Sequence, residues 1–424
     1  MTETAVGGDR QVPSPDPIAR DYLLLSLRLD QRIPGLVDGY FGPAALKAQV
    51  EIEQFPAPAR LVADAAGLLG RLDAEVDDPV RRDWLRVQLV ALEAHARTLV
   101  GDRLPYLDHV GRCFDALPAR RDEAVFRAAA EELDALLPGS VSLADRLAAW
   151  DADTIVPVER LRDVLDWLIG MVRERSVDTF GAPAGDALQV SLVTGRPWSG
   201  YNWYDGGLRS RFDVNTDLPV RAGDLIGLVA HETYPGHHLE HVWHEALRVN
   251  ERAELEASVL LINTPECLIS EGLAEVGRRF AVPPDIEPEL LAELLERARI
   301  PFGADPASRR SSVERAIRIR LARAALGPAS TNAALMLHVD GLDPSVVRDW
   351  LQRVAGMSPE RARKRLEFIE HPLWRTYVFV YDEGAALLER WLAMVPGDQQ
   401  AARFRRLLVE AVTPSGIASE IAAG

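Results

Sequence analysis

The sequence contains little cysteine. Cys113 and Cys267 are the only two in 424 residues, and neither belongs to a CxxC pair. Two isolated cysteines cannot form the disulfide framework of a small secreted protein, so a reducing compartment is expected. Long apolar runs are also missing: no segment approaches the roughly 18 residues that a membrane span needs. The N-terminal stretch MTETAVGGDRQVPSPDP lacks the apolar core of a secretory signal. We therefore expect a cytoplasmic protein with no membrane partner.

The sequence contains fewer basic than acidic residues. Lysine and arginine total 48 against 64 aspartates and glutamates, which gives a formal net charge of −16. This balance argues against nucleic acid as a partner, because nucleic acids bind basic surfaces. Hydrophobic residues make up 47% of the chain, which is ordinary for a packed globular protein.

Most of the chain carries a helical pattern. Asp78-Pro79 is a typical helix start. The apolar residues after it recur at spacings of three and four, as one helix face requires: Leu85, Leu89, Leu92, Ala96 and Leu99. We expect a flexible lead-in over residues 1–20, a helical N-terminal half over 21–185 and a metal-binding catalytic half over 186–424, all but the lead-in sharing one core.

Two short segments alternate as strands do. Leu188, Val190 and Leu192 form the first, and residues 208–214 form the second. Between them, GRPWSGYNWYDGG (residues 195–207) is rich in turn-forming residues. The fold class predicted is therefore mainly α, a multi-helix zincin-like architecture with a small antiparallel β-ribbon beside the active-site cleft.

Five of the nine histidines fall between residues 231 and 244, in the segment HETYPGHHLEHVWH. His231-Glu232 follows an apolar helical stretch, as in the H-E-x-x-H motif of zinc hydrolases. In that motif the histidines at i and i+4 bind the metal and the glutamate is the general base. Here position i+4 is Pro235, which cannot bind a metal, so the simple motif is absent.

His237 and His238 are the replacements for the missing ligand. On an ideal helix His238 lies about 20° from the direction of His231 but about 10.5 Å further along the axis. A kink at Pro235-Gly236 would shorten that gap. His237 faces the metal only if a wide turn adds roughly two residues. The spacing slightly favours His238, and both histidines remain candidates for the second metal ligand.

A second pattern overlaps the first. His237, Glu240 and His241 fit H-x-x-E-H, the inverted zincin motif, which needs no kink. In that interpretation His237 and His241 bind the metal and Glu240 is the base. The non-functional alternative is a histidine-rich helix exposed to solvent. His244 is expected to be a bystander.

The third ligand is expected on another helix. Thr264-Pro265 is a strong helix start, and Glu271 lies one and a half turns beyond it. Gly272 leaves room for another helix or a metal to approach. Glu275 is the competing ligand. Two histidines and one glutamate with an open fourth position are the arrangement of hydrolytic zinc sites.

The motifs HETYPGHHL and SEGLAE resemble the bacterial family known as domain of unknown function 885. Four further stretches also resemble it: GLVDGYFGP, FDVN, NAALMLHVDG and HPLWRTYVFVYDEG. The resemblance runs from about residue 20 to 395. It implies a helical zinc peptidase of the thermolysin-type clan. This chain departs from the family motifs at Glu240, where glutamine is usual, and at Leu273, where tryptophan is usual.

Carried onto this sequence, the resemblance implies metal binding by His231, by His237 or His238, and by Glu271, with Glu232 as the base. It disfavours the inverted motif.

Further roles follow from the chemistry of amide hydrolysis, which develops an oxyanion that needs a donor. Tyr381 matches a family tyrosine–glycine pattern and is the first candidate donor. Tyr377 is a second, and Arg375 is a third or a group that binds a substrate carboxylate. Asn215 and His338 are candidates for substrate binding, although His338 fits a core position equally well.

The sequence thus predicts a zinc-dependent metallohydrolase that cleaves amide bonds, with short peptides as its substrates. Manganese or iron would suit the same ligands. The alternatives are an amidase or deacylase acting on a small non-peptide amide, and an inactive helical binding or scaffold protein.

Overall fold

The computed structural model describes residues 16–372 and 374–424. It is mainly α-helical with small sheets, as the sequence predicts. Most of the expected lead-in, residues 1–15, lies outside the described residues, but Pro17 already begins a helix that the side chain of Asp16 caps. Within the described residues, no helix combines the length and the apolar composition needed to cross a lipid bilayer.

The helices of the N-terminal half are α1 (Pro17–Asp30), α2 (Ala44–Ile52), α3 (Pro58–Glu75), α4 (Pro79–Leu99), α5 (Tyr106–Phe114), α6 (Glu123–Leu136), α7 (Leu143–Asp153) and α8 (Val158–Phe180). Asp78 caps α4 as predicted, because its side chain accepts a hydrogen bond from the backbone N–H of Val80. The apolar stripe of α4 is buried from Leu85 to Ala96. The cap and the apolar stripe thus predict α4 correctly.

The helices of the C-terminal half are α9 (Ala222–Glu232), α10 (His237–His244), α11 (Pro265–Ala281), α12 (Glu287–Ala298), α13 (Pro306–Ala325), α14 (Ala329–His338), α15 (Pro344–Val354), α16 (Pro359–Glu370), α17 (Val380–Leu392), α18 (Gly397–Val409) and α19 (Pro414–Ala423). A π-helical segment, η1 (Glu245–Glu251), continues α10. Two short 3₁₀ segments are η2 (Leu255–Ser258) and η3 (Trp374–Thr376).

The strands are β1 (Val37–Tyr40), β2 (Ala187–Val193), β3 (Gly200–Tyr204), β4 (Arg209–Asn215) and β5 (Val259–Leu261). β1 and β5 form an antiparallel pair, and the other three form a sheet in the order β2-β4-β3. The two strands expected from the sequence, β2 and β4, pair in parallel. The antiparallel partner of β4 is β3. It occupies the stretch expected to be a turn, and it lies on the far side of β4 from β2.

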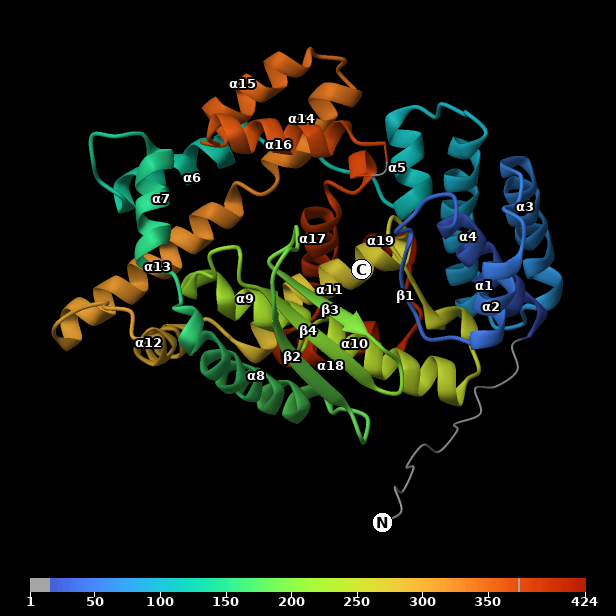
Figure 1. Ribbon diagram of the computed structural model, residues 1–424, viewed down its shortest axis with the longest axis horizontal. Coiled ribbons are helices and arrows are strands. Elements are labelled where there is room, and N and C mark those ends of the chain that lie inside the picture. The colour runs from blue at the N-terminus through green and yellow to red at the C-terminus, as the bar shows by residue number, and fades with distance from the viewer. Residues whose placement is uncertain (1–15, 373) are drawn as a thin grey trace.

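The hydrophobic core joins both halves of the chain. Its larger cluster extends from Ala94 on α4 to Ile417 on α19. A second cluster packs α1, α3 and α4 against the segment from Val249 to Leu261. Figure 1 shows α1–α4 gathered on one side of the molecule, with the sheet and α9–α11 near its centre. The histidine-bearing helices therefore lie where the two halves meet.

Candidate metal centre

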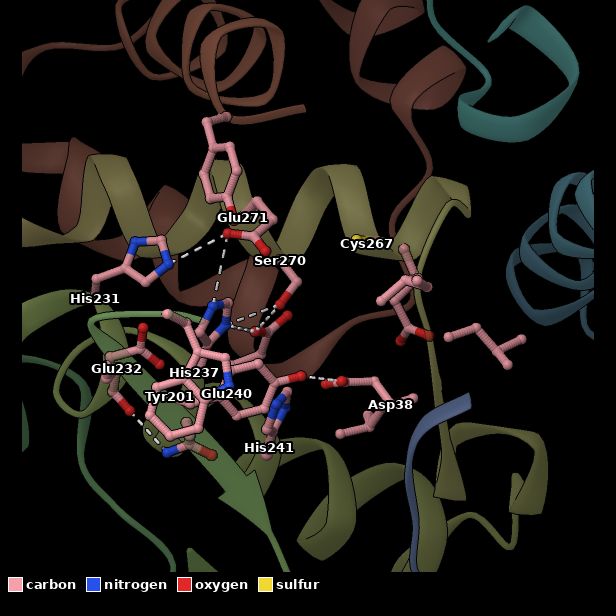
Figure 2. Close-up of a pocket in the computed structure, with 18 of the residues that line it drawn as sticks. Asp38, Tyr201, His231, Glu232, His237, Glu240, His241, Cys267, Ser270 and Glu271 are labelled. Carbon is pink, nitrogen blue, oxygen red and sulfur yellow. Dashed lines mark hydrogen bonds and ion pairs between the residues drawn. The ribbon is translucent and has the colours of Figure 1, made fainter. Parts of the chain in front are cut away.

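A cavity of about 240 Å³ lies among β1, β3, β5, α9, α10, α11 and α17. Figure 2 shows the side chains that point into it, with His231, His237 and Glu271 close together. Segments far apart in the sequence thus contribute to one site.

The backbone between α9 and α10 makes a wide turn. The N–H of Gly236 donates to the carbonyl oxygen of Ala230, and the N–H of Leu239 donates to that of Thr233. These hydrogen bonds span six residues, whereas those of an α-helix span four. The turn therefore contains two extra residues, as His237 needs in order to face the same side as His231.

Gly236 makes this turn possible. A Cβ atom at this position would lie 1.9 Å from the carbonyl oxygen of His231. The backbone of α10 therefore approaches the end of α9 more closely than any side chain allows.

The imidazoles of His231 and His237 converge on one carboxylate oxygen. The Nε2 atoms lie 3.2 Å and 3.8 Å, respectively, from Oε2 of Glu271. Bonds of about 2.0–2.1 Å in a tetrahedral zinc site place neighbouring ligand atoms about 3.4 Å apart. Oε2 is buried and makes no hydrogen bond. The three residues present therefore fit a zinc ion.

Each proposed ligand also contacts a further polar side chain. Nδ1 of His231 lies 3.5 Å from Oε1 of Glu275, and Nδ1 of His237 lies 3.6 Å from Oε2 of Glu240. Tyr377 donates its hydroxyl to Oε1 of Glu271 at 2.8 Å. Carboxylates behind histidine ligands fix the ring orientation in many metal sites. Glu275, the competing ligand, thus lies behind His231.

The pKa values of these groups reflect close contact between opposite charges. Burial lowers the pKa of His231, but Glu271 and Glu275 outweigh burial and hold it well above its usual value. Burial raises the pKa of Glu271, but the two histidines lower it on balance. Attraction between carboxylate and imidazole therefore dominates at this cluster, and a divalent cation would take the place of the proton.

Glu232 lies beside the cluster and lines the cavity, with 9% of its surface exposed. Its carbonyl oxygen accepts a hydrogen bond from Nδ2 of Asn202 at 2.8 Å, which ties the end of α9 to β3. Burial raises the pKa of the Glu232 carboxyl. A carboxylate with a raised pKa next to a metal site suits a general base.

Tyr377 and Tyr381 reach the cluster from the η3–α17 segment. The ring centroid of Tyr381 lies 6.2 Å from that of His231 and 5.9 Å from that of Tyr377. Close packing of two glycines brings α17 here, because a Cβ on Gly272 would lie 2.5 Å from the carbonyl carbon of Gly384. Gly272 therefore admits a neighbouring helix, one of the two partners expected for it.

The inverted motif also forms a compact group. His237, Glu240 and His241 offer ligand atoms within 4.8 Å of one another, as do His231, His237 and Glu271. Yet the Oε2 of Glu240 already accepts a hydrogen bond from Ser270. Oε2 of Glu271, by contrast, is buried without a hydrogen bond and faces both imidazoles, so the set built on Glu271 is the better donor set.

His238 does not face the cavity, contrary to the slight preference from helix geometry. It is fully buried, and its Nδ1 lies 2.7 Å from Oγ of Ser210 on β4. Its Nε2 lies 3.7 Å from Oδ2 of Asp186. One residue along a helix turns the side chain by about 100°. The wide turn that brings His237 to the cavity therefore directs His238 to the sheet.

Three further candidates lie outside the cavity. Asn215 donates Nδ2 to the carbonyl oxygens of the 196–198 loop and so stabilises that loop. His338 lies against the ring of Tyr106, and its Nε2 is 2.9 Å from the carbonyl oxygen of Ile369. Arg375 donates to Nδ1 of His109. All three thus make hydrogen bonds within the fold, and none of them lines the cavity.

Asp38, Tyr201 and Asn202 also line the cavity, and no role was predicted for them. Tyr201 donates its hydroxyl to Oδ1 of Asp38. Asp38 belongs to GLVDGYFGP, one of the stretches that resemble the family, and this was the available signal. Tyr201 and Asn202 lie in the segment taken for a turn, where three aromatic residues within five positions were a sign of a strand.

No family model matches the chain, and no curated protein matches it. Four chains among the solved structures match. One is described as "the putative lipoprotein from Colwellia psychrerythraea", with 14% identity and a TM-score of 0.48 over 98% of this chain and 77% of that one. Another is described as "a putative lipoprotein of unknown function from Shewanella oneidensis", with 11% identity and a TM-score of 0.46 over 86% and 72%. The resemblance to domain of unknown function 885 stays a prediction.

Proposed function

We propose that this protein is a metal-dependent hydrolase of amide bonds. Zinc is the proposed metal, with His231, His237 and Glu271 as its ligands. The observation that carries this proposal is the convergence of two Nε2 atoms on a buried carboxylate oxygen that lacks a hydrogen-bond partner. The Nδ1 atoms face two other carboxylates, as the histidines of metal sites commonly do.

The chemistry follows from the groups around the cavity. A bound zinc ion would lower the pKa of a coordinated water toward about 7 and polarise the substrate carbonyl. Glu232 accepts a proton from the attacking water and delivers it to the leaving amine. Tyr381 lies beside the same cluster and donates its hydroxyl to the developing oxyanion. Tyr377 holds Glu271 in place.

Short peptides are the proposed substrates. The cavity of about 240 Å³ suits a small substrate or a short peptide better than a folded protein. A small non-peptide amide would fit the same space, so an amidase or deacylase is the second candidate. We also propose a cytoplasmic location, because Cys113 and Cys267 are both free thiols.

Replacement of Glu232 by glutamine tests the proposed base. Glu232→Gln keeps the size of the side chain but removes its ability to accept a proton. We expect peptide cleavage to fall by at least about a hundredfold, with zinc still bound at one ion per chain. Digestion of a peptide library, read by mass spectrometry, measures the activity. An active Glu232→Gln variant would refute this assignment, and cleavage of non-peptide amides alone would favour the second candidate.

A further inference from the structure

The cavity is rich in negative charge. Its lining includes five carboxylates, and among the described residues that line it there is no arginine or lysine. A bound divalent cation would offset only two negative charges. Away from the proposed metal site, a substrate carboxylate would therefore meet no arginine or lysine in this cavity, whereas a positively charged group would be attracted.

Four of the five carboxylates have a basic side chain as partner or a proposed role. Glu232 and Glu271 belong to the proposed catalytic centre. Glu240 lies 3.6 Å from Nδ1 of His237, and Glu266 lies 3.3 Å from a guanidinium nitrogen of Arg248. The fifth carboxylate is Asp38.

Asp38 is held toward the cavity but has no cationic partner. Its Oδ1 accepts the hydroxyl proton of Tyr201. In the part of the chain that the structure describes, no arginine, lysine or histidine forms an ion pair with it. Figure 2 shows Asp38 across the cavity from His231, with the hydroxyl of Tyr201 between the two sides. Asp38 is half-buried, and a carboxylate at a cavity wall without a counter-ion attracts a positively charged ligand.

A second group that lines the cavity, the side-chain amide of Asn202, has an oxygen without a hydrogen-bond donor. Asn202 is 8% exposed, lines the cavity and uses its Nδ2 to bind the carbonyl oxygen of Glu232. Its Oδ1 is buried and has no hydrogen-bond partner. An unsatisfied buried acceptor costs about 1–3 kcal/mol. A ligand with N–H groups would satisfy this oxygen.

We propose that Asp38, positioned by Tyr201, binds a primary ammonium group of the substrate. In a peptide this group is the free amino terminus, and the enzyme then cleaves near the amino end. The position of cleavage rests on the proposed function, whereas the binding of the ammonium group by Asp38 does not. An ammonium supplies three donors and one positive charge, which match a carboxylate that lacks a counter-ion.

The test measures binding of matched probes to the full chain after treatment with a chelator, because an amine can also bind zinc directly. The probes are L-alanyl-L-alaninamide and its N-acetyl derivative, in which a neutral acetamide replaces the ammonium. We expect the free amine to bind at least about tenfold more tightly. Equal affinity for the two probes would overturn the proposal.

Two variants locate the effect. Asp38→Asn should abolish the difference between the probes, whereas Asp285→Asn, on the exposed surface, should preserve it. Tyr201→Phe removes only the hydrogen bond to Asp38 and should weaken binding of the free-amine probe a few-fold. This variant replaces Asp38→Asn in the test if Asp38→Asn does not fold. A preference that survives both cavity variants would contradict the assignment to Asp38.

A third probe, N-acetyl-L-lysine amide, separates the two sources of an ammonium. Tighter binding of this probe that depends on Asp38 would support the ammonium site and assign it to a lysine side chain. Zinc content, measured on samples not treated with chelator, separates the two proposals. Zinc binding without preference for the amine overturns the ammonium site alone, and the reverse result overturns the metal centre alone.

Discussion

His237 and His238 are neighbours with different surroundings. His237 lines the cavity, with its Nε2 toward Glu271, whereas His238 is fully buried against Ser210 and Asp186. His238 holds α10 against the sheet, and His237 is the proposed metal ligand. Two identical side chains thus have different surroundings because neighbouring residues on a helix point about 100° apart.

Alanine substitutions separate these functions. We expect His237→Ala to lose zinc with little change in the free energy of unfolding of the metal-free protein. His238→Ala should retain zinc but lose about 2 kcal/mol of stability, because it leaves buried polar partners unsatisfied. Elemental analysis and urea unfolding measure the two quantities. Loss of zinc from His238→Ala with retention in His237→Ala would contradict the account.

At the residue scale the sequence predicts the types of ligand better than their identity. The spacing of the histidines does not decide whether His237 or His238 is the second ligand. The stretch SEGLAE likewise does not decide whether Glu271 or Glu275 is the third. Only the path of the backbone decides between such neighbours. Glu271 faces the cavity, and Glu275 lies behind His231.

At the scale of elements, the turn between α9 and α10 decides the geometry of the site. Its six-residue hydrogen bonds bring two histidines that are six positions apart to one side. Proline and glycine in the sequence predict a break at this place. They do not specify how wide the turn is, because that depends on contacts with other elements.

Gly236→Ala tests the importance of this turn. The added methyl group would overlap the carbonyl oxygen of His231, so the helices must separate. We expect a loss of at least about 3 kcal/mol in unfolding free energy and a more than tenfold weaker affinity for zinc. Gly227→Ala is the matched control, because that glycine lies within α9 with open space around it. The control should be neutral or more stable by up to about 1 kcal/mol. Equal behaviour of the two variants would count against the turn.

The strands were harder to predict than the helices. Helix caps and apolar stripes are local signals, and Asp78 with the stripe that follows it gave the correct helix. Strand pairing is not local. The stretch at 195–207 contains enough glycine to suggest a turn, yet tertiary contacts make Gly200–Tyr204 a strand between β4 and the cavity.

At the scale of the whole molecule, the site combines residues that are more than 300 positions apart, from Asp38 to Tyr381. No pattern within one segment reveals such a combination. Two of the stretches that carry the family resemblance contribute residues to the cavity. GLVDGYFGP supplies Asp38, and HPLWRTYVFVYDEG supplies the two tyrosines. By contrast, the candidates drawn from FDVN and NAALMLHVDG, Asn215 and His338, lie outside the cavity.

The stability of the molecule should depend on pH through Asp382. Burial raises its pKa to about 6 from an ordinary 3.8. The folded protein therefore favours the protonated form. This contribution is fully present below pH 4 and is lost as the pH rises through 6. Relative to Asp382→Asn, the wild type should lose about 2 kcal/mol of unfolding free energy between pH 4 and pH 7. Urea unfolding of both proteins across this range measures the difference, and parallel pH profiles would refute the assignment.

The central claim is that His231, His237 and Glu271 together hold one metal ion. The most direct test is a crystal structure of the zinc-treated protein, with anomalous diffraction recorded at the zinc absorption edge. The account predicts one strong peak in contact with Nε2 of both histidines and Oε2 of Glu271. A peak among His237, Glu240 and His241 instead, or no peak in this cavity, would contradict it.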